Sequence, residues 1–480
     1  MCASIRLLWR KWGCRMAGSP GMDRRTFFGG MAAIGGAAAL PGAARAAAAE
    51  VEKGFLREPA RDIPVAGECD VLVAGGGPAG IAAAIGAARK GAKVILLEAK
   101  GTVGGIWTNG LLGCLLGFNY SAFDREILDR LGKYRAYRTR SPESNFHAFV
   151  YEPEYMKVVC EELLSEAGVR VRLGTGVVSA VKEGRSVKAV VTESKSGREA
   201  WLAKSFVDCT GDGDLAALAG CGFDVGGAER GDPEQPASMI AVFTLPDDSG
   251  ILKFVANEHT NYDSMGEQLL NSKVELGKEL ERIGLNPSYG HPTIFRMNKN
   301  LFILMANHEY DVPVDDADRI GAATMRARRE IIDLAEALAM DSWRQPGHKG
   351  PWAGLRIVAT ADQICHRRAR RIHGRYTMKV DDCFSGAAFD DAVATCRFGI
   401  DVHAVSQHMN KKCPAGSPFR RESKPYQIPL RACRAADLDN LYMAGRCISG
   451  DFFTQASYRI TGTAVEMGYN VGAAAFDLKR

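Results

Sequence analysis

The chain has 480 residues, enough for two or three domains, and its apolar fraction of 46% and charged fraction of 24% are ordinary for a globular protein. The formal charge is +5, but residues 1–46 hold seven basic residues and one acidic residue, which leaves the rest of the chain at −1. The body of the protein therefore has no basic excess, and this argues against binding to nucleic acid or to an anionic membrane surface.

The first 49 residues carry the features of an export signal. Arg24 and Arg25 precede a weakly apolar run that ends near Leu40, and an Ala-Arg-Ala sequence follows at 44–46. The segment resembles a twin-arginine signal peptide, and its apolar run of about fourteen residues is too short to span a bilayer. We expect export to the bacterial periplasm by the twin-arginine translocation machinery, with no stable membrane anchor. A disordered Ala/Gly leader whose arginines are incidental is the alternative.

The segment 69–98 predicts a strand, a glycine-rich turn and a helix. The apolar run 71–74 is β-branched at two of its four positions and too short for a helix, so it indicates a buried parallel strand. Three glycines follow it. Gly75 allows the tight turn, Gly77 lets the backbone approach a pyrophosphate, and Gly80 lets the next helix pack closely against the strand.

The helix after this turn begins near Ala79, with Pro78 before it, and ends at Gly91. Its free N–H groups and positive dipole end are expected to face the phosphates. A second strand, residues 94–97, ends at Glu98, whose carboxylate can accept hydrogen bonds from a ribose 2′-OH and would repel a 2′-phosphate. Strand, turn, helix, strand and acid occur in the required order, so we predict dinucleotide binding rather than a flexible loop.

A glycine-rich loop at 101–110 follows Glu98 and is too long for a simple βα connection. A plain NAD-binding domain has no need of it. In FAD-binding folds that resemble glutathione reductase, a glycine doublet at the place of Gly104 and Gly105 lies against the ribityl chain and the pyrophosphate. The alternative is an ordinary loop.

The next segments predict a helix at 153–168 and short strands at 169–173, 176–181 and 186–192, which we interpret as a β-meander inserted in the nucleotide-binding domain. A further strand runs into an acidic turn, 208–214, that contains Thr210, Gly211 and Asp212 and leads into a helix. This second strand, turn and helix N-terminus suits a flavin nucleotide that lies across the sheet. A calcium loop is the alternative, but the turn lacks the length and the closing glutamate of an EF-hand.

The character of the sequence changes near residue 225. Strands at 238–245 and 301–305 and a long helix from about 320 to 340 predict a second, substrate-side domain. An arginine-rich stretch, 364–376, has interleaved apolar residues, which indicates that alternate arginines point inward.

Four motifs in the second half resemble those of the FAD-dependent oxidoreductase family. The family pattern R-E-x-R-R-I-x-G falls on 367–374, D-I-H on 401–403, Y-x-I-P on 426–429 and N-L-x-x-A-G-R on 440–446. One departure is Arg368, which stands where the family usually has an acid, so we expect an internal ion pair to be lost there.

The resemblance implies an α/β fold: a discontinuous, Rossmann-like FAD-binding domain of glutathione-reductase type (66–224 and 431–480) with the inserted meander, and a mixed α+β substrate or cap domain (225–430) after the leader (1–49). It implies non-covalent FAD. We expect no metal site. The residues expected to contact FAD are Gly75, Gly77, Pro78, Ala79, Gly80, Glu98, Ala99, Gly104, Gly105, Val178, Thr210, Gly211, Asp212, Gly445, Arg446, Gly462 and Thr463.

The expected function is that of a dehydrogenase. Because the sequence has no second glycine fingerprint for NAD(P)H, we expect a small organic substrate to pass hydride to flavin N5 and the electrons to leave to a quinone, a cytochrome or O₂. The expected base is His403, which Asp401 can influence, and the expected carboxylate clamp is Arg371, with Arg431 and Tyr426 as alternatives. An electron-transfer or assembly flavoprotein without its own substrate, and an NAD-dependent dehydrogenase, are the other two hypotheses.

Thirteen cysteines are present, of which eleven follow the leader. They are scattered and form no C-x-x-C pair, which argues against an iron–sulfur cluster or a structural zinc site. We expect most of them to be small buried residues. Cys114 follows the glycine-rich loop, but as a lone cysteine it is expected to pack rather than react.

Overall fold

The computed structural model describes residues 51–52, 55–56, 58, 60–118, 120–139, 149–226, 234–258, 265–412 and 423–477. The chain divides into two units, Met1–Asp62 and Ile63–Arg480. In the first unit the described residues form one antiparallel pair, β1 (Val51–Glu52) and β2 (Phe55–Leu56). The expected export signal lies outside the described residues, and everything below concerns the second unit.

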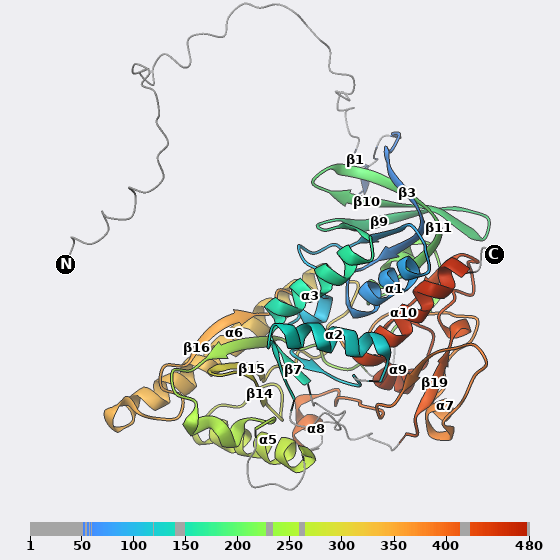
Figure 1. The fold of residues 1–480 in the computed structure, drawn as a ribbon. Helices are drawn as coiled ribbons and strands as arrows, with labels where there is room; N and C mark the ends of the chain where they lie inside the picture. The colour runs from blue at the N-terminus through green and yellow to red at the C-terminus, as the bar shows by residue number, and fades with distance from the viewer. Residues whose placement is uncertain are drawn as a thin grey trace, which may run out of the picture. The chain divides into compact units, whose positions relative to one another are not determined.

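A seven-stranded sheet forms the centre of the second unit (Figure 1). Five of its strands are parallel: β8 (Arg170–Arg172), β4 (Val94–Leu97), β3 (Val65–Ala74), β11 (Gly197–Asp208) and β20 (Leu441–Met443). The other two, β10 (Ser186–Ser194) and β9 (Gly176–Glu183), continue the sheet from β11 in antiparallel pairing. The last four residues of β3 and all of β4 are buried, as expected of apolar strands covered on both faces.

Helices α1 (Pro78–Arg89) and α10 (Thr461–Asp477) lie side by side next to this sheet (Figure 1). Proline at the first position of α1 suits a helix start, and Gly91 (φ 94°) follows its end. The two helices approach so closely that a Cβ atom at Gly472 would lie 2.0 Å from the carbonyl oxygen of Ala83. The small residues of both helices therefore bring their backbones into direct contact.

Two further helices, α2 (Ala122–Lys133) and α3 (Pro153–Glu166), belong to the same body, beside a small sheet of β5 (Cys114–Leu115), β7 (Phe149–Tyr151) and β6 (Tyr137–Thr139). Helix α2 starts with a capping box, in which Ser121 and Asp124 each accept a hydrogen bond from the other's backbone N–H. The remaining short elements are η1 (Gly105–Trp107), α4 (Asp214–Leu218), β12 (Phe223–Asp224), β17 (Arg371–Ile372), α7 (Val380–Ser385), β18 (Ala392–Cys396), α8 (Gln407–Lys412), β19 (Tyr426–Pro429), η5 (Leu430–Ala432) and α9 (Phe452–Tyr458).

A second, fully antiparallel sheet has the strand order β14 (Thr293–Asn298), β15 (Leu301–Met305), β13 (Ile240–Thr244) and β16 (Arg356–Thr360). It is accompanied by η3 (Ser249–Phe254), α5 (Met265–Arg282), α6 (Ala317–Arg344) and η4 (Pro346–His348). The strands and the long helix expected in this region are present. Helix α6 starts three residues earlier than expected because the side chain of Asp316 caps it by accepting from the N–H of Arg319.

The buried apolar residues form two clusters, and they divide the chain differently from the expected domain boundary at 430. One cluster contains residues of 237–365 together with Leu111, Cys114 and Val150. The other contains the glycine-rich strand and helix together with Ile372, Tyr426 and Ile428. Buried residues of 372–402 and of 426–428 therefore pack in the nucleotide-side core. The reason is that β17 pairs with β12 and that the side-chain amide of Asn470 in α10 donates a hydrogen bond to the carbonyl of Val393 in β18. These short strands therefore contact nucleotide-side elements.

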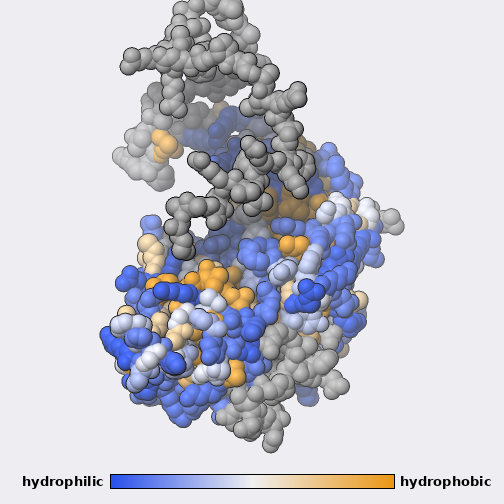
Figure 2. Space-filling view, turned by 60° about the vertical axis from the view of Figure 1, so that its left-hand side comes forward, coloured by the Kyte–Doolittle hydropathy of each residue, from blue (hydrophilic) through white to orange (hydrophobic). Residues whose placement is uncertain are grey.

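The face drawn in Figure 2 is mostly hydrophilic, with hydrophobic residues gathered in one patch and scattered elsewhere. Within the described residues no helix has the length and apolar character needed to cross a membrane. All ten cysteines in those ranges are buried, and no group of three or more His, Cys, Asp or Glu side chains there could hold a metal ion.

Because α1 and α10 are in close contact, we predict that a glycine-to-alanine change in α10 destabilises the protein, although such a change usually stabilises a helix. Ala normally favours a helix, but G472A places a methyl group against the Ala83 carbonyl, so we expect the free energy of unfolding to fall by about 1–3 kcal/mol. The matched control is G321A in α6, where no atom lies within 4 Å of the new Cβ and stability should rise by about 0.4–1 kcal/mol. Urea unfolding measures both, and equal effects of the two variants would contradict the packing.

Candidate functional site

A cavity of about 680 Å³ lies between the two clusters of buried residues. Its nucleotide end is lined by the glycine-rich turn, the end of β4, the start of β9, the end of β11 and the residues after β20. Its inner end is lined by residues of the antiparallel sheet, of α5 and α6, and of the segments 362–367 and 398–403. Side chains far apart in the sequence thus face one space.

The glycine-rich turn presents its backbone to the cavity. Gly75 has φ 95°, and a Cβ there would lie 2.4 Å from the carbonyl oxygen of Cys209, so only glycine fits. At Gly77 a Cβ would meet no atom within 4 Å, because this residue faces open space. Gly77 also precedes α1, so no side chain caps the N–H groups of the first turn. These donors are available to an anionic ligand.

Glu98 lies at the end of β4 with its carboxylate fixed by the backbone. Oε2 accepts from the N–H of Gly76 at 2.6 Å and Oε1 from the N–H of Lys100 at 2.7 Å. Gly104 donates its N–H to the carbonyl of Gly76 at 2.8 Å, and a Cβ at Gly105 would lie 2.9 Å from the Cα of Gly77. The glycine doublet therefore lies directly against the glycine-rich turn.

The acidic turn after β11 uses its first carboxylate internally. Asp208 is fully buried and accepts hydrogen bonds from Thr210 and from the N–H of Ala216, so it organises the start of α4. Burial raises the pKa of this carboxyl, against the hydrogen bonds. Asp212 pairs with Arg446 at 2.7 Å at the cavity wall. This arrangement gives no support to the calcium-loop alternative, since Asp208 is directed at backbone N–H groups.

His403 lies at the inner end of the cavity, with Nε2 3.4 Å from Oδ2 of Asp401. Burial, followed by the charge of Arg367, lowers the pKa of His403 to about 4, and Asp401 opposes the shift only in part. For Asp401 burial acts to raise the pKa, but His403 and Arg459, whose Nη2 lies 3.1 Å away, lower it overall. At neutral pH the pair is therefore a neutral imidazole beside a carboxylate.

The family model described as FAD dependent oxidoreductase matches residues 70–478. The chain belongs to this family, and its cofactor is FAD. Among curated proteins no match was found.

Solved structures that resemble the chain are remote. They include p-nitrophenol 4-monooxygenase from Pseudomonas putida, with 16% identity, a TM-score of 0.37 and coverage of 63% of this chain and 69% of that one. The flavin-dependent brominase Bmp2 has 13% identity, a TM-score of 0.45 and coverage of 86% and 79%. THI4 from Thermovibrio ammonificans has 25% identity, a TM-score of 0.28 and coverage of 33% and 66%.

The nucleotide end of the cavity fits FAD: uncapped N–H groups and an open glycine for the pyrophosphate, and a fixed carboxylate for the ribose. Most residues expected at FAD line it, namely Gly75, Gly77, Pro78, Ala79, Glu98, Ala99, Gly105, Thr210, Gly211, Asp212, Gly445 and Arg446.

Five expected residues are not among those that line the cavity. Gly80 and Gly104 lie in the layer behind it, where a Cβ at Gly80 would lie 1.8 Å from the Gly75 carbonyl oxygen. Val178 is exposed and its neighbour Val177 lines the cavity, since successive side chains of β9 point to opposite faces. Gly462 packs on the backbone of Gly117 and Thr463 is buried, whereas the adjacent Thr461 and Ala464 line the cavity.

The three residues expected to clamp a carboxylate do not line the cavity. Arg371 is buried in β17, and its charge acts on Tyr458. Arg431 lies at the surface, where it pairs with Asp390 and Asp391. Tyr426 is buried in the nucleotide-side core. The expected alternation of arginines fails because only 371–372 of this stretch form a strand, so residue 367 and not 371 reaches the cavity.

Arg368 and Cys114 are the other two residues of the cavity region for which the sequence led to an expectation. Arg368 does not lose its ion pair: it pairs with Glu234, and both side chains are buried. The acid is supplied by a distant segment instead of the motif itself. Cys114 lines the cavity, and burial raises the pKa of its thiol, so it is held as the neutral thiol.

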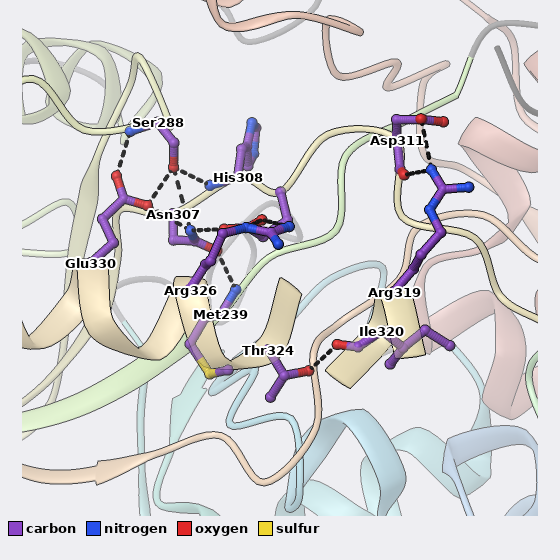
Figure 3. A network of polar contacts seen from close by, with 11 residues as sticks. Met239, Ser288, Asn307, His308, Asp311, Arg319, Ile320, Thr324, Arg326 and Glu330 are labelled. Atoms are coloured by element: carbon purple, nitrogen blue, oxygen red, sulfur yellow. Dashed lines mark hydrogen bonds and ion pairs between the residues drawn. The ribbon is translucent and has the colours of Figure 1, made fainter. Parts of the chain in front are cut away.

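A polar network behind the inner end fixes residues that the sequence did not reveal (Figure 3). Glu330 of α6 accepts from the N–H and the hydroxyl of Ser288, both at 2.6 Å, and from the amide of Asn307 at 2.6 Å. The Ser288 hydroxyl accepts from the N–H of His308 at 2.8 Å. The adjacent Tyr289 lines the cavity, and its ring centroid stacks 4.1 Å from that of His308.

Gly77 supplies a test of the FAD site. Because a methyl group there meets no protein atom and the φ of −76° suits any residue, G77A should leave the melting temperature of the apoprotein unchanged. The methyl group would occupy cofactor space, so we expect the Kd for FAD to rise about tenfold or more, measured by fluorescence titration. The matched control is G101A, which also adds its methyl group to open space but outside the cavity. Unchanged FAD binding by G77A would contradict the site.

Proposed function

We propose that the protein is a FAD-dependent dehydrogenase that oxidises a small organic substrate at carbon, with the electrons leaving to a quinone, a cytochrome or O₂. The observation that carries this proposal is the presence of His403, paired with Asp401, in the cavity that the glycine-rich turn also lines. Bound FAD supplies the acceptor for the hydride. The chain's own residues must supply the base, the substrate site and the exclusion of water.

His403 is suited to remove the proton. With Asp401 beside Nε2, the favoured tautomer carries its proton on Nε2 and leaves Nδ1 as the acceptor. Nδ1 has no hydrogen-bond partner among the described residues. Asp401, kept ionised with the help of Arg459, would then stabilise the imidazolium that forms.

We also propose that the FAD-binding fold is of glutathione-reductase type, with an inserted meander in which β9 and β10 are the strands expected at 176–181 and 186–192 and β11 is the third. The strand expected at 169–173 is not part of it, because it forms β8, which pairs in parallel with β4. Consecutive antiparallel pairing of β9, β10 and β11 at one side of a parallel sheet supports this assignment.

Export through the twin-arginine route is proposed on the Arg24-Arg25 signal in the sequence. A protein whose cofactor lies between distant segments has reason to fold around it before translocation. The periplasm would then supply the electron acceptor.

The pH dependence of the reaction tests the role of His403. The basic, neutral form is the active one, and the pKa of about 4 means that it persists above that pH. We expect kcat/KM to be flat between about pH 6 and 8 and to fall as the pH drops toward 4, with no inflection near the usual 6.5. H403N should lower kcat by about 10²–10⁴ and retain its flavin absorbance.

Anaerobic mixing with hydroxy acids, sugars, steroids and dicarboxylates supplies the substrate screen for these measurements, with loss of the flavin absorbance as the readout. R431Q is the control variant, since Arg431 lies outside the cavity, and should match the wild type. A substrate that leaves the flavin oxidised until NAD(P)H is added would contradict the dehydrogenase proposal and favour oxygenation.

A further inference from the structure

Arg367 reaches the inner end of the cavity with one edge of its guanidinium group held by the protein. Nη1 donates to the carbonyl of Pro236 at 2.7 Å and to the hydroxyl of Ser238 at 2.8 Å. These bonds use both Nη1–H donors, while the Nε and Nη2 donors have no partner in the described part of the chain. The Nε–Nη2 edge is the fork that binds a carboxylate through two parallel hydrogen bonds.

The charges around Arg367 leave it without a fixed counter-ion. Arg459 and Arg446, the other arginines that line the cavity, pair with Asp401 and Asp212 respectively. Within the described ranges no carboxylate forms an ion pair with Arg367 or with Lys273, the lysine of α5 that lines the inner end. Asp362 also lines the cavity, so Arg367, Arg459 and Lys273 face two carboxylates, Asp401 and Asp362, and the inner end carries an excess of positive charge.

The two histidines nearby are consistent with that excess. Burial, and then the charge of Arg367, lowers the pKa of both His308 and His403, so both are neutral at neutral pH. Burial likewise lowers the pKa of Arg367 itself, the direction expected for a buried cation with too little negative charge beside it.

The walls around this charge are apolar. They comprise Ile240, Leu269, Phe295, Met305 and Ile320, from both the antiparallel sheet and the two helices α5 and α6. Such a surface favours a hydrocarbon or aromatic body and gives a polar substrate little to bind.

We propose that the substrate combines an apolar body with a carboxylate and that the Nε–Nη2 edge of Arg367 binds the carboxylate. The substrate class is thus an aryl or alkyl carboxylic acid that carries the oxidisable carbon. This assignment rests on the proposed dehydrogenase function for the reaction, but the anion site itself is testable without turnover.

The test is a titration of the purified holoenzyme with phenylacetate and with phenylacetamide, which share a shape and differ in charge. Perturbation of the flavin absorbance reports binding near the cofactor. We expect phenylacetate to bind at least about tenfold more tightly than phenylacetamide. In R367Q that preference should disappear through weaker phenylacetate binding, with the Kd for phenylacetamide and the FAD content unchanged. R367K, which keeps the charge and loses the fork, should lie between the two.

R431Q serves again as the control, because it removes a cation that lies outside the cavity and should keep the full preference. Equal binding of the two compounds by the wild type, no perturbation by either, or equal weakening of both in R367Q would overturn the proposal. Loss of FAD from both R367Q and R367K would overturn it too, by assigning the residue to the cofactor.

The outcomes also separate this proposal from the previous one. Carboxylate-selective binding with no anaerobic bleaching by any carboxylic acid would retain the anion site and remove the dehydrogenase. Bleaching by neutral substrates at equal rates in the wild type and R367Q would retain the dehydrogenase and remove the anion site.

Discussion

Direct contact between backbones at α1 is the constraint on which the rest of the structure depends. Gly80 lies against the turn at Gly75, and Gly75 lies against Cys209 at the end of β11. On the other side, Gly468 and Gly472 of α10 pack on carbonyl oxygens of α1. A single Cβ at any of these four glycines would displace a helix or a strand. The contacts hold the uncapped first turn of α1 at the cavity, where the dinucleotide needs it.

Electrostatic balance differs sharply between the two ends of the cavity. At the nucleotide end the polar groups are fixed by local bonds: Glu98 by backbone N–H groups, and Asp212 by Arg446. At the inner end, burial keeps His403 and His308 neutral, while Arg367 remains charged. The same low-dielectric surroundings that make an uncompensated cation costly also make its attraction to a matching anion strong. Selectivity and tightness of binding would then have one physical origin.

The nucleotide-binding unit could be predicted because its determinants are local. Strand, turn, helix and acid lie within 69–98, and each residue acts on near neighbours, so 71–74, 94–97 and Glu98 are found where the pattern puts them. Thr210 to Asp212 followed from a second strand, turn and helix start, and Gly445 and Arg446 from a motif shared with the family. Placement of His403 in the cavity followed in the same way.

The inner end could not be predicted because it is assembled from distant segments. The pairing of β17 with β12 decides whether Arg367 or Arg371 faces the cavity. The spacing of residues within the arginine-rich stretch does not predict that pairing. Glu234 forms an ion pair with Arg368, which lies 134 residues later in the sequence, and Glu330 accepts hydrogen bonds from Ser288, which lies 42 residues earlier. The packing of 372–402 and 426–428 with the nucleotide-side core likewise depends on tertiary contacts. Val178 was expected at the cavity, but its neighbour Val177 lines it, because successive residues of a strand point to opposite faces.

The burial of the ten described cysteines has a practical consequence for the chemistry of the molecule. Alkylating and oxidising agents react with exposed thiolates, and these sulfurs are shielded and held in the thiol form wherever burial raises the pKa. The folded chain can therefore meet an oxidising compartment without forming crosslinks at these positions. Cys114, Cys209 and Cys365 line the cavity, but a label acquired at one of the other seven in the native protein would mark a transient opening of that part of the core, so thiol trapping reports local unfolding at seven positions.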